Sequence, residues 1–367
     1  MSILKKNINN LPPTKRVLVA PLDWGLGHAT RSILIIRELL EQGFEVMLAA
    51  EKGGAALLNT EFPQLEILPL KGYRVTYSKN EKFFFFKMLL QGPTILRSIH
   101  YEHKWLSAVI KKYAIDIVIS DNRFGFFNKN VHNIFITHQL YIKTGNSFSE
   151  RIAQKINYRY INKFDECWVP DEAGEKNLGG VLSHPELMPR IPVKYIGVLS
   201  RFEKYTTEQY IDLLIMLSGP EPQRTLFENI LLRQLKTVDL KIVLVRGLPT
   251  GKSIESGMSD NVKIFNHLAG TALNELILSS KVIVARSGYT TVMELAALNR
   301  KAILIPTPGQ TEQEYIANYL SDKNYCTTSS QKSFSLLAAL EQIKHVKLSR
   351  FPNTDNNMIS DAISGLQ

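Results

Sequence analysis

Cysteine is scarce in this sequence. Two cysteines, Cys167 and Cys326, occur among 367 residues, far apart and outside any CxxC pair or Cys/His cluster. This spacing argues against a disulfide framework and against a cysteine-based zinc site, and it is typical of proteins kept in a reducing compartment. We therefore expect a cytoplasmic protein.

Long apolar runs are missing as well. A membrane-spanning helix needs about 20 consecutive apolar residues. The nearest approach to such a run, at 83–96, is interrupted by Lys87, Gln91, Gly92 and Pro93. Residues 1–16 contain no apolar segment of the kind found in secretory signals. The sequence therefore predicts neither a membrane span nor a signal peptide.

Acidic residues are in the minority. The chain has 44 lysines and arginines against 34 aspartates and glutamates, which gives a net charge of +10 at neutral pH. Such a surplus favours anionic partners, namely nucleic acid, phosphorylated substrates or an acidic membrane surface. No nucleic-acid-binding motif accompanies the charge, so we expect no nucleic-acid partner.

What the sequence does contain is a regular alternation of strand-like and helix-like segments. Continuous apolar runs rich in β-branched residues predict strands buried on both faces, and amphipathic segments between them predict helices. The predicted strands, some with the loop that follows, are 16–22, 44–50, 65–70, 115–121, 133–139, 166–171, 193–199, 212–221, 240–247, 261–268, 281–288 and 301–309. The predicted helices are 28–42, 53–62, 81–112 with a break at 92–93, 149–164, 223–235, 271–280, 289–299 and 311–323.

A polar seam at 200–210 divides this alternation into two similar halves. A chain of 367 residues also exceeds what one hydrophobic core usually serves. We therefore predict an α/β protein with two Rossmann-like, doubly wound domains, at 1–205 and 206–367, that face each other across a cleft. The last helix has the option of packing back on the first domain. Ligands of such sheets bind beyond the carboxyl ends of the strands.

The first strand-to-helix loop is rich in small residues. In "DWGLGHAT", at 23–30, Gly25 and Gly27 let the backbone approach a ligand closely, and His28 lies at the start of the predicted helix. Thr30 stands where a dinucleotide-binding fingerprint has its third glycine, which argues against a nicotinamide site. A tight turn with a solvated His28 is the alternative, and the loop by itself favours that alternative.

A second loop, "ARSGYTTVMEL" at 285–295, offers hydroxyls and backbone N–H groups where a strand passes into a helix. Those groups suit a phosphate at a helix N-terminus, and Glu294, on the same helical face as Thr291, suits a ribose diol. A capping box formed by Thr291 and Glu294 explains the same pattern. The residues singled out are Arg286, Ser287, Gly288, Thr290, Thr291 and Glu294.

Two further loops of the second half occupy the same place in the strand–helix order. The loop at 217–223 contains Ser218 and Gly219. The loop at 305–318 has more polar side chains than a helix cap requires, which favours ligand binding over a solvated first turn. These side chains are Gln310, Thr311, Gln313 and Glu314. Loops at equivalent strand ends suit a nucleoside diphosphate held by helix N-termini, with an acid on its ribose.

With these loops in order, the chain resembles the two-domain GT-B glycosyltransferases. It is most similar to the MurG-like, family 28-like enzymes that use UDP-linked sugars, over most of its length. "RSGYTTVMEL" resembles their donor-binding loop. The resemblance implies that Ser287, Gly288 and Thr291 lie near the phosphates and that Glu294 binds the ribose hydroxyls.

The resemblance extends to other segments of the chain. "NVKIFNHL", at 261–268, is similar to the segment whose backbone contacts the uracil, around Phe265 and Asn266. "TPGQTEQEYIAN" resembles the sugar-binding loop, with Gln313 and Glu314 where relatives often have two glutamines, so the sugar itself stays open. The resemblance also implies that the glycine-rich loops bind the donor, through Gly25, Gly27, Ser218 and Gly219.

The implied chemistry is sugar transfer, with inversion, from a UDP-sugar to a hydroxyl of a glycan or a lipid-linked acceptor. A base must take the hydroxyl proton, and the pKa of histidine suits this step, so His28 is the predicted base. No Asp-x-Asp pair follows a predicted strand, so we expect no metal ion and no other cofactor. Asp121 and His138 follow strands of the first half, where they line the acceptor side or assist His28. A structural role as satisfied buried polar groups explains them equally well.

Residues 79–112 combine bases with apolar side chains. Four phenylalanines at 83–86 lie among lysines and arginines that outnumber the acids of this segment. The pattern suits a peripheral contact with an anionic membrane at the inner face of the cell, where a lipid-linked acceptor would reside. A core helix with a solvated basic rim is the alternative.

Two other functions fit the same architecture. A nucleotide-sugar epimerase or hydrolase would release sugar and UDP without an acceptor. A non-catalytic module would bind the nucleotide sugar without turning it over. Assays of donor hydrolysis and of nucleotide binding separate both from a transferase.

Overall fold

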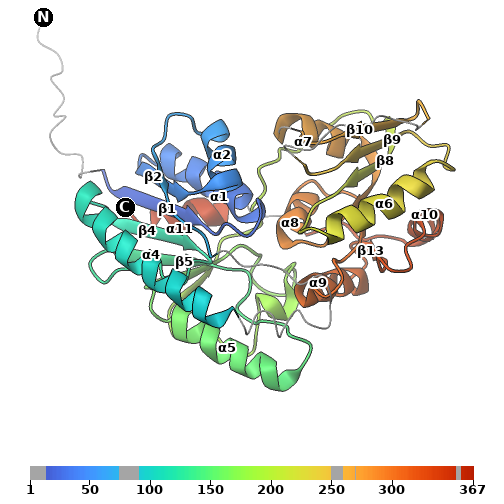
Figure 1. The fold of residues 1–367 in the computed structure, drawn as a ribbon. Coiled ribbons are helices and arrows are strands. Elements are labelled where there is room, and N and C mark those ends of the chain that lie inside the picture. Colours follow the sequence, from blue (N-terminus) through green and yellow to red (C-terminus); the bar gives the residue numbers. More distant parts are fainter. Residues whose placement is uncertain (1–13, 74–90, 249–258, 269, 353–356) are drawn as a thin grey trace, which may run out of the picture.

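The computed structural model of the protein describes residues 14–73, 91–248, 259–268, 270–352 and 357–367 (Figure 1). Over these residues the strands form one seven-stranded and one six-stranded sheet, in the orders β3-β2-β1-β4-β5-β6-β7 and β10-β9-β8-β11-β12-β13. The paired strands are parallel throughout. Both orders are those of doubly wound nucleotide-binding folds. The predicted α/β class with two Rossmann-like domains is therefore confirmed.

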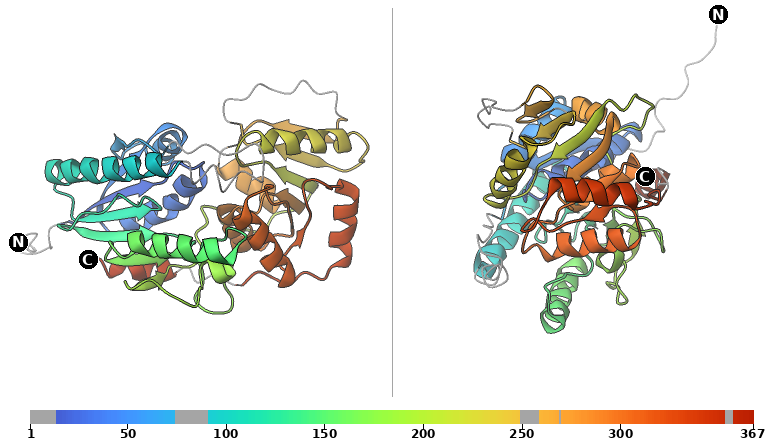
Figure 2. Two further views of the ribbon diagram at one scale, coloured as in Figure 1. Left: turned by 60° about the horizontal axis from the view of Figure 1, so that its bottom comes forward. Right: turned by 90° about the vertical axis from the view of Figure 1, so that its right-hand side faces the viewer.

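The elements follow the chain in the predicted alternation (Figures 1 and 2). The strands are β1 (Arg16–Pro21), β2 (Glu45–Ala50), β3 (Ile67–Pro69), β4 (Ile117–Asp121), β5 (His132–Ile136), β6 (Glu166–Val169), β7 (Val193–Tyr195), β8 (Ile211–Met216), β9 (Ile242–Val245), β10 (Val262–Phe265), β11 (Ser280–Ala285), β12 (Ala302–Leu304) and β13 (Thr327–Thr328). The helices are α1 (Gly27–Glu41), α2 (Lys52–Glu61), α4 (Gly92–Tyr113), α5 (Ser147–Ile161), α6 (Gln223–Leu235), α7 (Gly270–Leu278), α8 (Tyr289–Ala297), α9 (Thr311–Asp322), α10 (Leu336–His345), α11 (Asn357–Ser364) and the short 3₁₀ helix η3 (Gly180–Leu182).

Strand β1 shows why an unbroken apolar run becomes a central strand. Its side chains alternate between two hydrophobic clusters, because successive residues of a strand point to opposite faces. Val17 and Val19 pack in the cluster that contains α1, whereas Leu18 packs with Leu106 of α4. Helices therefore cover both faces of the first sheet.

The predicted helix at 81–112 is only partly comparable with the structure. Its first part falls within 74–90, outside the described residues. Helix α4 begins at Gly92 with Pro93 in its first turn, which is where the sequence places a break. A proline is tolerated there because the first N–H groups of a helix have no partner within the helix. Across the described part of the chain, no helix is both long and apolar enough to cross a bilayer.

The last helix returns to the first domain. Gln42, at the end of α1, donates a hydrogen bond to the carbonyl of Ser360 in α11 at 2.9 Å. Lys15 donates to the carbonyl of Leu366 at 2.7 Å. Figure 1 shows the C-terminus beside the first sheet, far from α10. The chain therefore crosses between the domains twice, once before β8 and once after α10.

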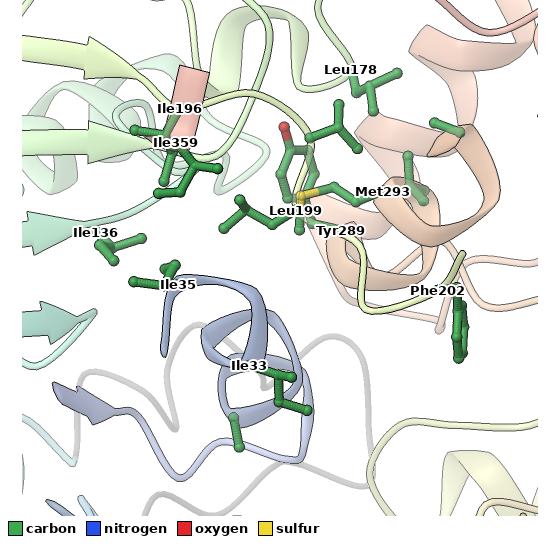
Figure 3. Packing of buried hydrophobic residues seen from close by; sticks show 14 of the residues in the cluster. Ile33, Ile35, Ile136, Leu178, Ile196, Leu199, Phe202, Tyr289, Met293 and Ile359 are labelled. Atoms are coloured by element: carbon green, nitrogen blue, oxygen red, sulfur yellow. The ribbon is translucent and has the colours of Figure 1, made fainter. Parts of the chain in front are cut away.

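One hydrophobic cluster continues from the first domain into the second (Figure 3). It includes Ile33 of α1, Leu199 and Phe202 of the connecting segment, and Tyr289 and Met293 of α8. A shared apolar core resists relative motion of the domains more than a polar interface does. The carboxyl edges of the two sheets are thereby held close together, next to the loops in which the sequence places the site.

Candidate active site

The first loop meets the second domain directly. Gly25 has φ 81°, in the left-handed region that glycine adopts without a steric penalty. A Cβ at Gly27 would lie 3.0 Å from the hydroxyl oxygen of Thr290, at the start of α8. That hydroxyl donates to the carbonyl of Gly27 at 3.3 Å. The glycine at 27 therefore allows two loops from opposite domains to touch.

His28 lies against a buried carboxylate. Its Nδ1 is 3.0 Å from Oδ1 of Asp121, the last residue of β4, which is the neighbour of β1. Burial lowers the pKa of His28, against the opposing effect of Asp121, so the neutral imidazole is favoured. Burial alone would raise the pKa of Asp121, but Arg31 and His28 hold it well below its usual range. The side chain of His28 keeps 14% of its surface exposed, whereas that of Asp121 is fully buried.

Arg31 joins the polar residues of the first domain into a network. Its Nε donates to Oδ2 of Asp121 at 2.7 Å, and Nη2 donates to Oδ1 of the same carboxylate. Nη1 lies 3.0 Å from Nδ1 of His138, and Nη2 lies 2.9 Å from Nδ1 of His28. Arginine can only donate, so Nδ1 of His138 accepts and its proton resides on Nε2. Nδ1 of His28 faces both a donor and an acceptor, so each of its tautomers finds a partner.

Glu312 extends this network across the domain boundary. It lies in the first turn of α9 and accepts from Nε2 of His138 at 2.7 Å and from the amide of Gln139. Burial would raise the pKa of Glu312, but His138, His28 and Arg31 lower it, so the carboxylate stays charged. The ring of Tyr289 stacks on His138 with 4.2 Å between the centroids. His138 and Asp121 thus form a buried network beside His28, as an assisting or structural role requires.

The loop after β11 opens α8 differently from a capping box. The helix starts at Tyr289 with Gly288 as its N-cap, and no side chain caps it. The alternative in which Thr291 caps the helix is therefore wrong. A Cβ at Gly288 would meet no atom within 4 Å, so the backbone there is open. Ser287 is fully buried and donates to the carbonyl of Gln313 at 2.8 Å, which joins this loop to α9.

Arg286 is turned into the protein. It is buried, and its guanidinium donates to the carbonyl of Ile305 at 3.3 Å and to the side chain of Gln331 at 2.6 Å. Its cation also lies over the ring of Phe227, and burial lowers its pKa to about 10. In this arrangement Arg286 supports the loops from beneath and contacts protein groups, so direct contact with a donor does not follow from the geometry.

Glu294 lies on α8 and faces the connecting segment. Its carboxylate accepts from Nε of Arg201 at 3.2 Å. Burial raises the pKa of Glu294 to about 6, although Arg201 opposes the shift. A buried carboxylate with a raised pKa is under-solvated and gains from further hydrogen-bond donors. A pair of ribose hydroxyls would supply them.

The loop before α9 is held by its own side chains. The amide of Gln313 accepts from the backbone N–H of Thr307 at 2.9 Å and donates to Oε1 of Gln310 at 2.5 Å. Both ends of the Gln313 side chain are therefore occupied within the loop. Glu314 is exposed and accepts from the N–H of Gly309 at 3.2 Å. Thr311 donates to the carbonyl of Lys143 in the first domain at 2.6 Å.

A cavity of about 390 Å³ opens between the domains at this place. The second domain contributes side chains from the first turns of α9, and the first domain contributes the start of α5 with the loop before it. The lining residues are Lys143, Gly145, Asn146, Ser147, Glu150, Thr311, Glu314 and Tyr315. Hydrogen bonds from Glu312 to His138 and from Thr290 to Gly27 thus join the two domains, and the expected cleft is open at this cavity.

The remaining predicted donor residues lie at the same edge of the second sheet. Gly219 has φ 98°, and a Cβ there would lie 3.5 Å from the hydroxyl of Thr307, so the loops after β8 and β12 are neighbours. The carbonyls of Phe265 and Asn266 accept from backbone N–H groups of the loop after β9, both at 2.8 Å. Ser218 lies in the loop after β8, and Phe265 is 36% exposed.

Several residues of the site were not singled out from the sequence. Arg31 lies one helical turn after His28, a spacing that places two side chains on one helix face. Tyr289 and Glu312 stand within the two donor-side motifs, but their partners lie in the other domain. Nothing local in the sequence marks Gln139 or Arg201. Among the described residues, no group of three or more histidine, cysteine or acidic side chains is arranged to hold a metal ion.

Two family models match the chain, one for each domain. Residues 231–366 match the glycosyltransferase family 28 C-terminal domain. Residues 16–137 match a glycosyl transferase family 1 model. The first match includes the loops at 261–268, 285–295 and 305–318, and the second includes His28, Arg31 and Asp121.

Relatives and solved structures agree with these matches. An uncharacterized glycosyltransferase of Methanosarcina acetivorans is 23% identical over 333 residues, which cover 84% of each chain. A UDP-N-acetylglucosamine--N-acetylmuramyl-(pentapeptide) pyrophosphoryl-undecaprenol N-acetylglucosamine transferase of Sulfurihydrogenibium is 23% identical over 33% of this chain and 34% of its own.

Two solved structures share the whole fold. The glycotransferase of kitacinnamycin has a TM-score of 0.63 at 15% identity, covering 97% of this chain and 94% of its own. Acinetobacter baumannii MurG has a TM-score of 0.54 at 13% identity, covering 96% and 95%. The fold and the two domain matches define a glycosyltransferase of the GT-B class. Within that class the second domain is similar to the family 28 C-terminal domain, and a third of the chain is similar to the N-acetylglucosamine transferase named above.

Proposed function

We propose that this glycosyltransferase moves a sugar from a UDP-sugar to an acceptor hydroxyl by a single inverting displacement that needs no metal ion. His28 is the base, and Asp121 orients it. The observation that carries the proposal is the buried pair of His28 and Asp121, placed at the edge that faces the uncapped starts of α8 and α9. A neutral histidine held by a carboxylate is suited to take a proton from a hydroxyl.

The proton and the leaving group move to opposite sides of the site in this proposal. The acceptor oxygen bonds to the anomeric carbon as its proton passes to Nε2 of His28, and Asp121 stabilises the imidazolium through Nδ1. The bond between the sugar and the diphosphate breaks, and negative charge develops on the leaving oxygen. Backbone N–H groups at the starts of α8 and α9, which no side chain caps, are aligned to stabilise that charge.

The donor nucleotide rests on the second domain. Glu294 is the predicted ribose ligand, Gly288 the point of closest backbone approach to the phosphates, and Phe265 with Asn266 the predicted uracil contact. The name of the Sulfurihydrogenibium relative, which includes UDP-N-acetylglucosamine, supports a uridine nucleotide. Glu314 is exposed at the mouth of the interdomain cavity, where a sugar would meet the acceptor.

The acceptor is proposed less specifically than the donor. A glycan or a lipid-linked acceptor is proposed, together with a cytoplasmic location at the inner membrane face. The basic and apolar segment at 79–112 was predicted as a membrane contact, but residues 79–90 lie outside the described residues. In the described part of the segment, helix α4 exposes Leu96 and Tyr101, which fits a surface position for this helix.

The test compares His28→Ala with the unaltered protein. Thermal-shift titration with UDP measures donor binding, and release of UDP from candidate UDP-sugars measures turnover with and without EDTA. We expect His28→Ala to lose about 10²–10⁴-fold in turnover and to keep the UDP shift. The acid limb of kcat/KM for the unaltered protein should lie below pH 6.5, because burial lowers the pKa of His28. NMR of the transferred sugar reports inversion.

Each rival outcome is distinct. Free sugar and UDP without any acceptor dependence would favour an epimerase or hydrolase. Binding of UDP without turnover of any donor would favour a binding module. Indifference of the melting temperature to every uridine nucleotide would refute the donor assignment, and loss of activity in EDTA would refute metal independence.

A further inference from the structure

Glu312 places a charge of the second domain inside the buried network of the first. Its Oε1 accepts from Nε2 of His138 at 2.7 Å, and its Oε2 accepts from the amide of Gln139. Both partners lie in the loop after β5, whereas Glu312 lies in the first turn of α9. The side chain of Glu312 is 32% exposed, and that of His138 is 7% exposed. This contact is therefore made only while α9 rests against the first domain.

Protonation of His28 would bring two cations together. Nη2 of Arg31 lies 2.9 Å from Nδ1 of His28, so an imidazolium N–H and the guanidinium would face each other. In the described part of the first domain, the carboxylate that joins this network is Asp121, and Arg31 already donates to both of its oxygens. Because Arg31 and Asp121 balance each other, a proton on His28 would add one uncompensated positive charge. Such a charge is costly to bury.

Glu312 supplies the negative charge that this balance lacks. With both histidines neutral, the network holds one guanidinium and two carboxylates, so uptake of a proton by His28 brings it to neutrality. His138 connects the two sides, because its Nδ1 accepts from Nη1 of Arg31 at 3.0 Å while its Nε2 donates to Glu312. His28 is among the groups that lower the pKa of Glu312, and by reciprocity the Glu312 anion favours protonated His28.

Tyr289 of α8 also faces this network, but it does not provide the charge. Its ring stacks on His138, and its hydroxyl donates to the carbonyl of Pro170 at 3.0 Å. Burial, together with the nearby Asp171, raises the pKa of Tyr289 well above the ordinary value, so the hydroxyl stays neutral. Among the described residues, the charged or titratable side chains that face His28 and Glu312 are Arg31 of α1, Asp121 of β4, His138 after β5 and Tyr289 of α8.

We propose that Glu312 is a positioning residue that gives His28 its proton affinity when the two domains meet. The inference rests on the proposed role of His28 as the base. Glu312 does not touch the acceptor hydroxyl; it acts through His138 and Arg31. The domain that binds the donor thereby also completes the charge balance of the base.

NMR titration of the His28 imidazole in the full, ligand-free chain tests this proposal, with His28→Ala to assign the resonance. Glu312→Gln removes the charge and keeps an oxygen that accepts from His138. We expect the proton affinity of His28 to fall about tenfold, which lowers its pKa by about one. The acid limb of kcat/KM should move about one pH unit lower, and kcat should fall about tenfold because the base is weaker. A purely structural role would not move the acid limb.

Asp322→Asn is the matched control, because it removes one charge from an exposed position at the far end of the same helix. It should leave the pKa of His28 unchanged. Glu312→Asp keeps the charge on a shorter side chain, so it should restore most of the proton affinity even if the hydrogen bond to His138 is lost. Melting temperatures report whether each variant is folded.

Three results would overturn the inference. They are an unchanged pKa of His28 in Glu312→Gln, an equal fall in Asp322→Asn, and a pKa in Glu312→Asp as low as in Glu312→Gln. Failure of the proposed function looks different. Turnover that survives His28→Ala would refute the base, whereas the titration, which needs no substrate, would still decide whether Glu312 sets the proton affinity of His28.

Discussion

The two sheet edges that meet at the candidate site are built from opposite kinds of group. The edge of the first domain gathers charges and imidazoles, with Arg31, Asp121, His28 and His138 in one buried network. The edge of the second domain presents glycine, hydroxyls and the N–H groups of two helix starts that no side chain caps. The first arrangement suits movement of a proton, and the second suits binding of an anion.

The difference follows from the physics of each task. A proton acceptor needs a tuned pKa and a nearby carboxylate that stabilises its protonated form, and buried charges are tolerated only when they are paired, as Arg31 and Asp121 are. A diphosphate brings its own charge, so backbone N–H groups suffice and no cation has to be buried to receive it. Glu312 is the exception, because it carries a negative charge from the second domain into the network of the first.

The largest effect is expected at the edge of the first domain. Asp121→Asn keeps the shape of the side chain but removes the acceptor that favours Nδ1–H on His28. We expect kcat to fall about 10²–10⁴-fold, as expected when a base loses the carboxylate that orients it. Binding of UDP, measured by thermal shift, should not change, because the donor rests on the other domain.

Asp116→Asn is the matched control for this variant. Asp116 stands just before β4 at the opposite end of the same strand and accepts from the backbone N–H of Arg16 at 2.8 Å. Equal losses of kcat in the two variants would mean that Asp121 supports only the fold, and a lower melting temperature for Asp121→Asn alone would reveal that contribution.

The next largest effect is expected at the edge of the second domain. Gly288→Ala adds a methyl group where no protein atom lies within 4 Å, so the melting temperature should stay constant. If phosphates approach the backbone there, the methyl group displaces them, and the UDP dissociation constant should rise about 10–100-fold by calorimetry. Gly54→Ala, in α2, is the control, since its Cβ would make an ordinary 3.7 Å contact. An unchanged dissociation constant would remove Gly288 from the donor site.

A smaller effect with a distinctive pH dependence is expected at Glu294. Its pKa of about 6 reflects burial, and ribose hydroxyls that donate to the anion would lower that pKa in the complex. The bound protein then holds fewer protons than the free protein near pH 6, so UDP affinity should rise from about pH 5 to about pH 7 and level off above it. Glu294→Gln should bind about tenfold more weakly and show only the smaller rise that comes from ionisation of the terminal phosphate of UDP itself. A rise as large in the variant as in the unaltered protein would assign the titration to another group.

The sequence was enough to predict which loops lie at each edge, but not how every side chain of those loops is oriented. Parallel strands bring all their carboxyl ends to one border, so the order of strands and loops was enough to gather the loops at 23–30, 285–295 and 305–318 at two edges. The loop residues themselves were harder. Gln313 and Arg286 stand in the right segments, but both side chains are turned inward and hold the loops.

The contacts between the edges could not be predicted at all. Local periodicity fixes each domain, but it says nothing of how two domains face each other. Glu312 stands next to Gln313 in the sequence, and its role appears only when His138, 174 residues earlier, is placed beside it. Arg31 is the opposite case, because its distance of one helical turn from His28 was available in the sequence.

The smallest predicted effect tests whether the two edges act as one site. Thr290→Val keeps the branched shape and removes the hydroxyl that donates to the carbonyl of Gly27 at 3.3 Å. One neutral hydrogen bond contributes about 0.5–1.5 kcal/mol, so kcat/KM should fall severalfold. Thr290→Ser, which retains the donor, should restore it. If only the dissociation constant of UDP changes, the hydroxyl serves the donor alone. If kcat falls as well, the start of α8 also positions the loop that carries His28. The edges of the two domains then depend on each other.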